Sequence, residues 1–131
     1  MTYIIRKSIL TPVKEIVRVY DEMSKGNVQV QVTYKSKDEL GKMAESIRKT
    51  NALIASYIRD ISEKLELMSK GDMRIDINLD YVGDFAQIKK AIENTENSLN
   101  NTLHMINMAA EQVSLGASQV SSGAQALATG A

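Results

Sequence analysis

The sequence predicts an all-α protein built from one helix–connector–helix unit that occurs twice. Three observations support this fold class. The segment Met23-Ser24-Lys25-Gly26 returns unchanged 45 positions later as Met68-Ser69-Lys70-Gly71. Apolar residues recur at steps of three and four around both copies, which is typical of coiled-coil helices. Each copy is followed by a short stretch of alternating apolar and polar residues. A repeat of this length defines the structural unit before any element is assigned.

The first predicted helix carries apolar residues at coiled-coil spacing: Ile9, Val13, Ile16, Tyr20 and Met23. Pro12 lies near its start, where a missing N–H costs least; if the helix begins further upstream, Pro12 is expected to kink it. Gly26 after Lys25 predicts the helix end, because glycine tolerates left-handed backbone and a cation suits the negative end of the helix dipole. Gly71 after Lys70 repeats this arrangement.

The connectors alternate apolar and polar residues, with Val28, Val30 and Val32 in the first unit and Met73, Ile75 and Ile77 in the second. Such alternation is typical of a β-strand. A single strand in each unit would have no partner, however, and would leave a bare edge. We therefore expect an extended segment that lies along a helix pair, with Val28 and Val32 in its groove.

The second helix of the first unit is predicted to begin at a capping box, with Ser36 as N-cap and Glu39 at the third helical position. Its seam runs from Leu40 to Met68, and neither Pro nor Gly interrupts it after Gly41. We therefore expect one helix over 40–70, about 40 Å long and shared by both units. The last helix is predicted to run from Phe85 into a stretch where alternate seam positions are Ala.

Composition predicts that each unit needs a second chain. Two helices and a connector leave an apolar stripe facing water, and domains this small usually need a disulfide, a metal or a partner. The chain has no Cys, which leaves a partner chain as the expected solution. We expect a parallel homodimer, because the unpaired stripes require a mate and the connector returns the chain to the same end for its second helix. The formal net charge is +0 and Trp is absent, which argues against a nucleic acid partner.

No catalytic, metal or cofactor site is predicted. His104 is the only histidine, and Met105-Ile106 follow it, whereas the phospho-accepting His of a histidine kinase is typically followed by Glu and a nearby Pro. Acidic residues do recur at equivalent places, since Glu39 and Asp84 each precede an apolar seam residue. This recurrence predicts a positional role at the start of the second helix.

The first unit resembles the HAMP domain, the linker of bacterial membrane receptors, in Pro12, Gly26, Val28, Val32 and the segment Asp38-Glu39-Leu40-Gly41. The second unit resembles it in Gly71, Met73, Ile77 and Asp84, although Gly83-Asp84-Phe85-Ala86 replaces the motif and no proline matches Pro12. The tail from Gln112 to Ala131 resembles the opening of the adaptation helix of methyl-accepting chemotaxis proteins.

The resemblance implies parallel homodimeric four-helix coiled coils that relay a conformational signal from a membrane helix to a kinase-controlling rod. The implied domains are a first HAMP unit over 1–58, a second over 54–106, and the start of the signalling helix over 107–131. The implied signal-relay residues are Pro12, Gly26, Val28, Val32, Glu39, Gly41, Gly71, Met73, Ile77 and Asp84. In the full protein, the implied partners are a histidine kinase and a coupling protein that bind beyond residue 131.

The resemblance also implies a cytoplasmic part of an inner-membrane protein. No apolar run here is long enough to cross a bilayer. Tyr3-Ile4-Ile5 before Arg6-Lys7 is similar to the cytoplasmic end of a membrane helix, so we expect membrane contact only through an upstream helix and a chain that is part of a longer protein. Two alternatives remain open: the HAMP linker of a sensor kinase or cyclase, and a purely structural coiled coil.

Overall fold

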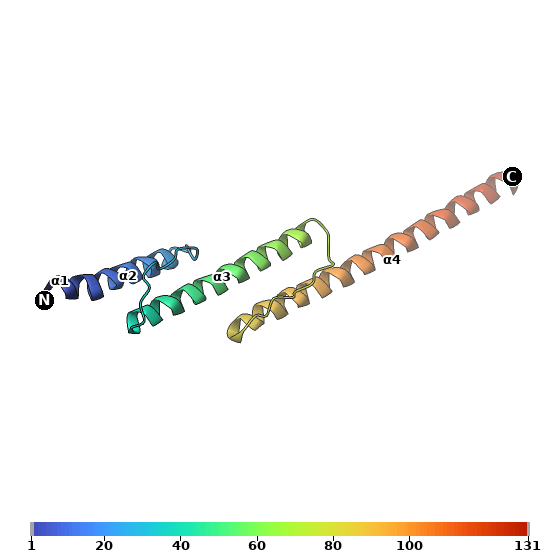
Figure 1. Cartoon of the computed structure of the whole chain (residues 1–131). Helices are drawn as coiled ribbons and strands as arrows, with labels where there is room; N and C mark the ends of the chain where they lie inside the picture. The colour runs from blue at the N-terminus through green and yellow to red at the C-terminus, as the bar shows by residue number, and fades with distance from the viewer. Residues whose placement is uncertain (1, 131) are drawn as a thin grey trace. The chain divides into compact units, whose positions relative to one another are not determined.

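The computed structural model describes residues 2–130 and shows an all-α chain, with no strand among these residues (Figure 1). The elements in order are α1 Thr2–Ile5, the π-helical turn η1 Arg6–Leu10, α2 Thr11–Ser24, α3 Glu39–Ser69, the 3₁₀ turn η2 Gly83–Phe85 and α4 Ala86–Gly130. The chain divides into two compact units, and the boundary between them follows Leu65. The all-α fold class predicted from the sequence is confirmed.

Pro12 is accommodated by a widened turn just before it. The N–H and the hydroxyl of Thr11 both donate to the carbonyl of Arg6, five residues earlier. A proline lacks the N–H for its own helical bond, and its ring crowds the carbonyl four residues before it. A π-helical turn relieves this crowding without ending the helix. The chain is therefore helical on both sides of Pro12, whose side chain is fully buried.

Both predicted glycine stops end their helices in the same way. Gly26 and Gly71 have φ values of +92° and +82°. The N–H of Asn27 donates to Glu22 over 3.0 Å, and the N–H of Asp72 donates to Leu67 over 3.0 Å. These are the bonds of a Schellman motif, which satisfies carbonyls that the helix itself leaves free.

The core of the first unit is small and lies between α2, α3 and the connector. Its buried members are Ile16, Val19, Val32, Ala44 and Ile47. Figure 1 shows that α2 and α3 run in the same direction, because the connector returns the chain to the end where α2 began. Of the two connector valines expected in the groove, Val32 is buried and Val28 is half-buried.

The second unit has few buried side chains: Met68, Ile77, Tyr81 and Ile92. Its long helix α4 begins after η2, not at Phe85 as the seam pattern predicted. After Glu96, every described residue of α4 is exposed except Gly116, which is half-buried. Exposed apolar residues along this stretch include Leu103, Ile106, Val113, Val120 and Leu127. This helix thus leaves a long apolar stripe uncovered by the chain itself.

Candidate functional site: the connector clamp and the helix junction

The connector of the first unit is bonded to α2 through Glu15. One carboxylate oxygen, Oε1, accepts from the backbone N–H of Thr33 at 2.6 Å and from its hydroxyl at 2.7 Å. The pKa of Glu15 is lowered, mainly by the Thr33 hydroxyl and then by the Thr33 N–H, because both bonds favour the charged carboxylate. Glu15 therefore holds the connector against the first helix.

On the opposite side, α3 binds three alternate carbonyls of the connector. Arg48 Nη1 donates to the carbonyls of Val32 at 3.0 Å and Tyr34 at 2.9 Å. Asn51 Nδ2 donates to the carbonyl of Val30 at 2.8 Å. Alternate carbonyls of an extended chain point to the same side, which lets one helix face reach all three. We name Glu15, Arg48 and Asn51 the connector clamp.

Asn51 is fully buried, and its second polar atom is not satisfied. Its Oδ1 has no hydrogen-bond partner among residues 2–130. A buried acceptor without a partner costs about 1–3 kcal/mol. Asn51 thus fastens the connector with one atom and destabilises the same packing with the other.

The junction between connector and α3 is capped by Asp38, and the predicted capping box of Ser36 and Glu39 is wrong. Asp38 Oδ1 accepts from the N–H of Gly41 at 2.8 Å, and Tyr34 donates its hydroxyl to Asp38 Oδ2 at 3.1 Å. The Gly41 N–H is the main cause of the lowered pKa of Asp38. Ser36 Oγ instead accepts from the N–H of Asp38. Because α3 begins at Glu39, the cap lies two residues later than the motif suggested.

Gly41 allows the connector to pass directly over the start of α3. A Cβ atom at this position would lie 1.9 Å from the carbonyl oxygen of Ser36 and 2.4 Å from its carbonyl carbon. No side chain fits there without moving the backbone. Residue 41 is also buried in the structure. Because a Cβ atom at this position would clash with the Ser36 backbone, the first unit requires glycine there.

The second unit builds its junction differently. Gly83 has a φ of +58° and opens η2, and the residue equivalent to Gly41 is Ala86, the first residue of α4. The connector is bonded to α4 through Glu96, whose Oε1 accepts from the N–H of Ile75 at 3.3 Å. Asp84 is exposed on η2.

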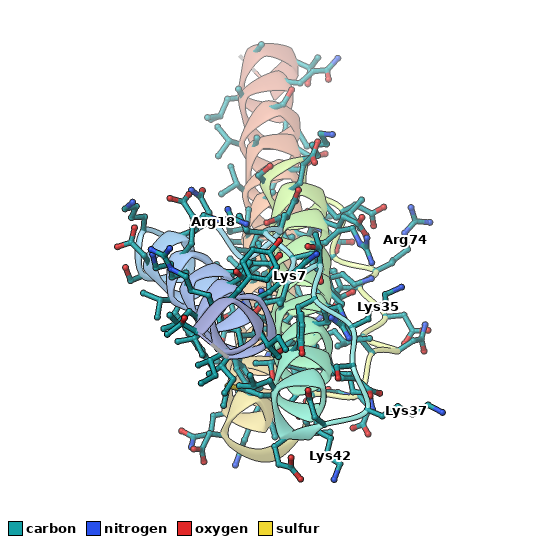
Figure 2. All side chains as sticks on the ribbon, turned by 60° about the vertical axis from the view of Figure 1, so that its left-hand side comes forward. Lys7, Arg18, Lys35, Lys37, Lys42 and Arg74 are labelled. Atoms are coloured by element: carbon teal, nitrogen blue, oxygen red, sulfur yellow. The ribbon has the colours of Figure 1, made fainter. Side chains whose placement is uncertain are left out.

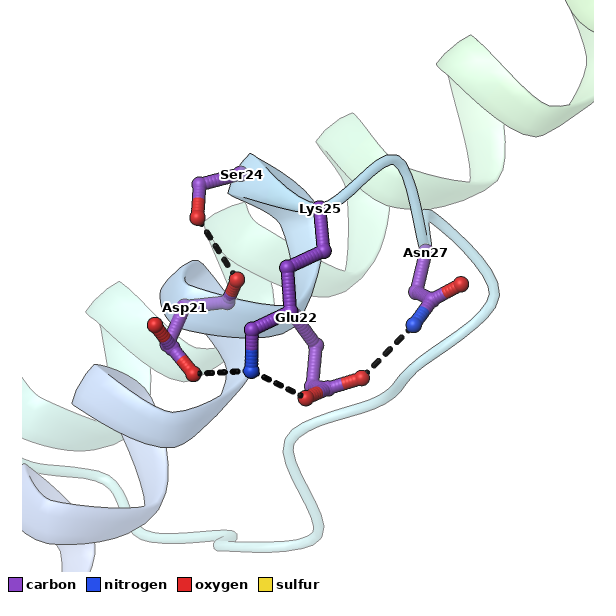
Figure 3. Close-up of polar contacts among 5 residues, drawn as sticks. All are labelled: Asp21, Glu22, Ser24, Lys25 and Asn27. Carbon is purple, nitrogen blue, oxygen red and sulfur yellow. Dashed lines mark hydrogen bonds and ion pairs between the residues drawn. The ribbon is translucent and has the colours of Figure 1, made fainter.

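Polar side chains reinforce the end of α2 (Figure 3). Lys25 Nζ donates to Asp21 at 2.6 Å and to Glu22 at 3.1 Å, while Asn27 Nδ2 donates to the other oxygen of Glu22 at 2.7 Å. The Asn27 amide is the main cause of the lowered pKa of Glu22. Ser24 donates its hydroxyl to the carbonyl of Asp21. The turn at Gly26 is thus bonded on both sides.

The ten residues predicted for signal relay do not form one cluster. Pro12, Val32, Gly41 and Ile77 are buried, Val28 and Met73 are half-buried, and Gly26, Gly71, Glu39 and Asp84 are exposed. The Glu39 side chain makes no hydrogen bond or ion pair with residues 2–130. The sequence analysis missed Glu15 and Arg48 in the connector clamp. The only signal that marks them is that each is a charged residue one position from a seam residue, Ile16 for Glu15 and Ile47 for Arg48.

The connector clamp holds the connector in place against α2 and α3. Within residues 2–130, no three acidic or histidine side chains gather as metal ligands. None of the helices in that range is both long and apolar enough to cross a bilayer. His104 lies exposed on α4.

Comparison with known families matches both units. Residues 4–50 match one family model described as the HAMP domain, and residues 57–104 match a second model of the same description. α3 extends from within the first match into the second. No curated protein and no solved structure matches the chain.

Proposed function

Because this chain belongs to the HAMP family and carries two such domains in tandem, which are non-catalytic signal-relay linkers, we propose that it couples a membrane sensor to a chemoreceptor's kinase-controlling coiled coil. The observation that carries the proposal is α3, a single helix of 31 residues that belongs to both family matches. Any rotation of this helix in the first domain is transmitted to the second, because a continuous hydrogen-bonded helix resists internal twisting.

The functional form is proposed to be a parallel homodimer. Ile9 on η1 and Val13, Val17 and Tyr20 on α2 are 37–62% exposed although they recur at helical spacing. Such a stripe needs a partner surface. A second copy supplies an identical stripe, and parallel pairing of two-helix units forms a four-helix bundle. Sedimentation of a folded monomer at micromolar concentration would refute this assembly.

Asn51 supports a relay with two packings of similar energy. Its unsatisfied Oδ1 raises the energy of the packing described here. A relay works when its two states differ by only a few kcal/mol, because a modest input then reverses their populations. The connector clamp keeps the connector attached to α2 and α3 in the packing described here, which is one of these two states.

The chemoreceptor context is favoured over a sensor kinase by the residues that follow the second domain. α4 continues as an Ala-rich heptad helix in which Glu111 is the only formally charged residue after Glu96. A kinase dimerisation helix would carry His followed by Glu and Pro, and His104 has neither. In the full receptor we propose a histidine kinase and a coupling protein as downstream partners, and attachment to the cell membrane. The alternative is a HAMP linker of a sensor kinase or cyclase.

An insertion series in α3 tests the relay. One residue added near Ser56 rotates everything downstream by about 100°, whereas seven added residues restore the heptad register. In the full receptor, the single insertion is expected to lock or invert kinase output, and the seven-residue insertion to preserve it. Equal effects of the two insertions would refute transmission through helix phase. If the full native receptor does not control the output of a kinase, this result would refute the chemoreceptor context instead.

A further inference from the structure

One end of the first unit gathers cations from three separate segments. This is the end to which the connector returns, as shown by a cavity that Ser8 and Ile9 of the first helical stretch line together with Leu40 of α3. Six exposed cations lie on the segments that meet at this end: Arg6, Lys7 and Lys14 on the first helical stretch, Lys35 and Lys37 in the connector, and Lys42 on α3. Lys7, Lys35, Lys37 and Lys42 are labelled in Figure 2, where the Lys37 side chain extends outward from the ribbon. We name these six residues the basic collar.

The collar lysines differ from the other lysines of the unit in having no ion pair. Lys25, Lys49 and Lys64 each pair with an acid on the preceding turn of their helix. Lys7, Lys14, Lys35, Lys37 and Lys42 form no ion pair with the described residues. The lysines of the unit that have no ion pair are therefore all collar residues.

Few acids compete at this end. Residues 2–14 contain no Asp or Glu. Glu15 is engaged with Thr33, and Asp38 with the N–H of Gly41 and the hydroxyl of Tyr34. Of these three acids, Glu39 is the one whose exposed side chain has no hydrogen bond or ion pair with residues 2–130. Hydrogen bonds from neutral N–H and hydroxyl groups leave Glu15 and Asp38 negatively charged. The collar thus presents six positive charges against three carboxylates, which leaves an excess of positive charge at this end.

Apolar side chains lie beside these charges. Tyr3, Ile4 and Ile5 are 51–75% exposed, and a groove of about 500 Å³ is lined by Tyr3, Leu10 and Thr11 together with Arg6, Lys7 and Lys14. A tyrosine and aliphatic residues next to lysines suit the boundary between lipid headgroups and acyl chains, where an amphipathic side chain has one apolar and one hydrated end. A nucleic acid would leave these apolar groups exposed.

We propose that the basic collar binds the phosphate groups of an anionic bilayer surface. The connector residues Lys35 and Lys37 and the α3 residue Lys42 then contact the membrane as directly as the first helix does. This goes beyond the relay function and does not depend on it, since it needs neither a membrane-spanning helix nor a downstream kinase. It also places the junction at Asp38 and Gly41 within reach of the lipid charge.

Vesicle co-sedimentation of the chain tests the proposal. Binding is expected to phosphatidylcholine vesicles that contain phosphatidylglycerol, to weaken as salt is raised, and to be much weaker with phosphatidylcholine alone. Each basic residue near an anionic surface contributes about fivefold in partitioning. The triple variant Lys35→Gln, Lys37→Gln and Lys42→Gln should therefore lose about a hundredfold.

The matched control removes the same charge elsewhere in the unit, through Lys25→Gln, Lys49→Gln and Arg59→Gln. It should change partitioning by about twofold at most, because these residues lie away from the collar. Equal losses in the two triples would overturn the proposal, as would equal binding to neutral and anionic vesicles. Heparin serves as a soluble polyanion, and heparin binding as tight as vesicle binding would also overturn it. Circular dichroism of both triples verifies that the fold is retained.

Discussion

Replacing Gly41 by alanine should separate the connector from the start of α3. The new Cβ would lie 1.9 Å from the Ser36 carbonyl oxygen. To restore an ordinary contact of about 3.5 Å, the Ser36 backbone must move by about 1.5 Å. This movement pulls on the cap, because Asp38 donates its N–H to Ser36 and accepts from the N–H of residue 41.

The sign of the effect follows from two opposing magnitudes. Alanine is favoured over glycine within a helix by about 0.5–1 kcal/mol. Forcing an extra methyl group into a packed site costs about 1–3 kcal/mol. Because the clash is with backbone, which cannot rotate away, we expect a net loss of about 1–2 kcal/mol for Gly41→Ala. Urea denaturation at fixed protein concentration measures it, since assembly otherwise changes the midpoint.

Ala86→Gly is the matched control, because Ala86 is the equivalent residue of the second unit and begins α4 after η2. It removes helix propensity without a clash and should cost at most about 1 kcal/mol. Hydrogen exchange of the amides at 35–38 should accelerate in Gly41→Ala and not in Ala86→Gly. A Gly41→Ala protein that is as stable as the parent, with unchanged exchange at these amides, would refute the steric argument.

Three further predictions follow from the geometry. Gly26→Val and Gly71→Val should each lower the unfolding midpoint, because valine resists positive φ; midpoints unchanged in both variants would contradict this. Asp38→Ala should lower the midpoint in urea more than Glu39→Ala, since Asp38 provides the cap, and the reverse order would restore the capping box. Glu15 has a lowered folded pKa, so its stabilisation is present above the ordinary value of 4.5 and is lost as pH falls through the folded value. Glu15→Gln should flatten this acid dependence in a pH series of unfolding midpoints, and an unchanged slope would show that Glu15 does not cause it.

Features set by neighbouring residues could be predicted from the sequence. The stops at Gly26 and Gly71 depend on a few consecutive residues and on the special backbone freedom of glycine. The continuous helix was predicted over 40–70 because no breaker follows Gly41, and α3 runs over Glu39–Ser69. The capping residue was misplaced by two positions because Ser36 and Asp38 both have suitable side chains, and the path of the connector decides between them.

The connector clamp could not be predicted, because it depends on the register of an extended segment against a helix. Arg48 and Asn51 become clamp residues only when the carbonyls of Val30, Val32 and Tyr34 face α3. A shift of one residue would turn these carbonyls away. Packing of Val32 with Ile16, Val19, Ala44 and Ile47 sets the register, and periodicity alone does not contain this information.

At one pair of equivalent positions, the second helix of each unit holds its connector with opposite hydrogen-bond polarity. Asn51 donates to the carbonyl of Val30, whereas Glu96, its equivalent 45 positions later, accepts from the N–H of Ile75, the equivalent of Val30. A carboxylate has no proton to donate to a carbonyl at neutral pH. A carboxylate such as that of Glu96, which holds the connector of the second unit, would therefore repel the Val30 carbonyl in the first unit in the same register. The two units thus have similar apolar patterns but hold their connectors with different hydrogen bonds. The tandem domains are therefore sequence repeats that cannot be exchanged for one another in a relay.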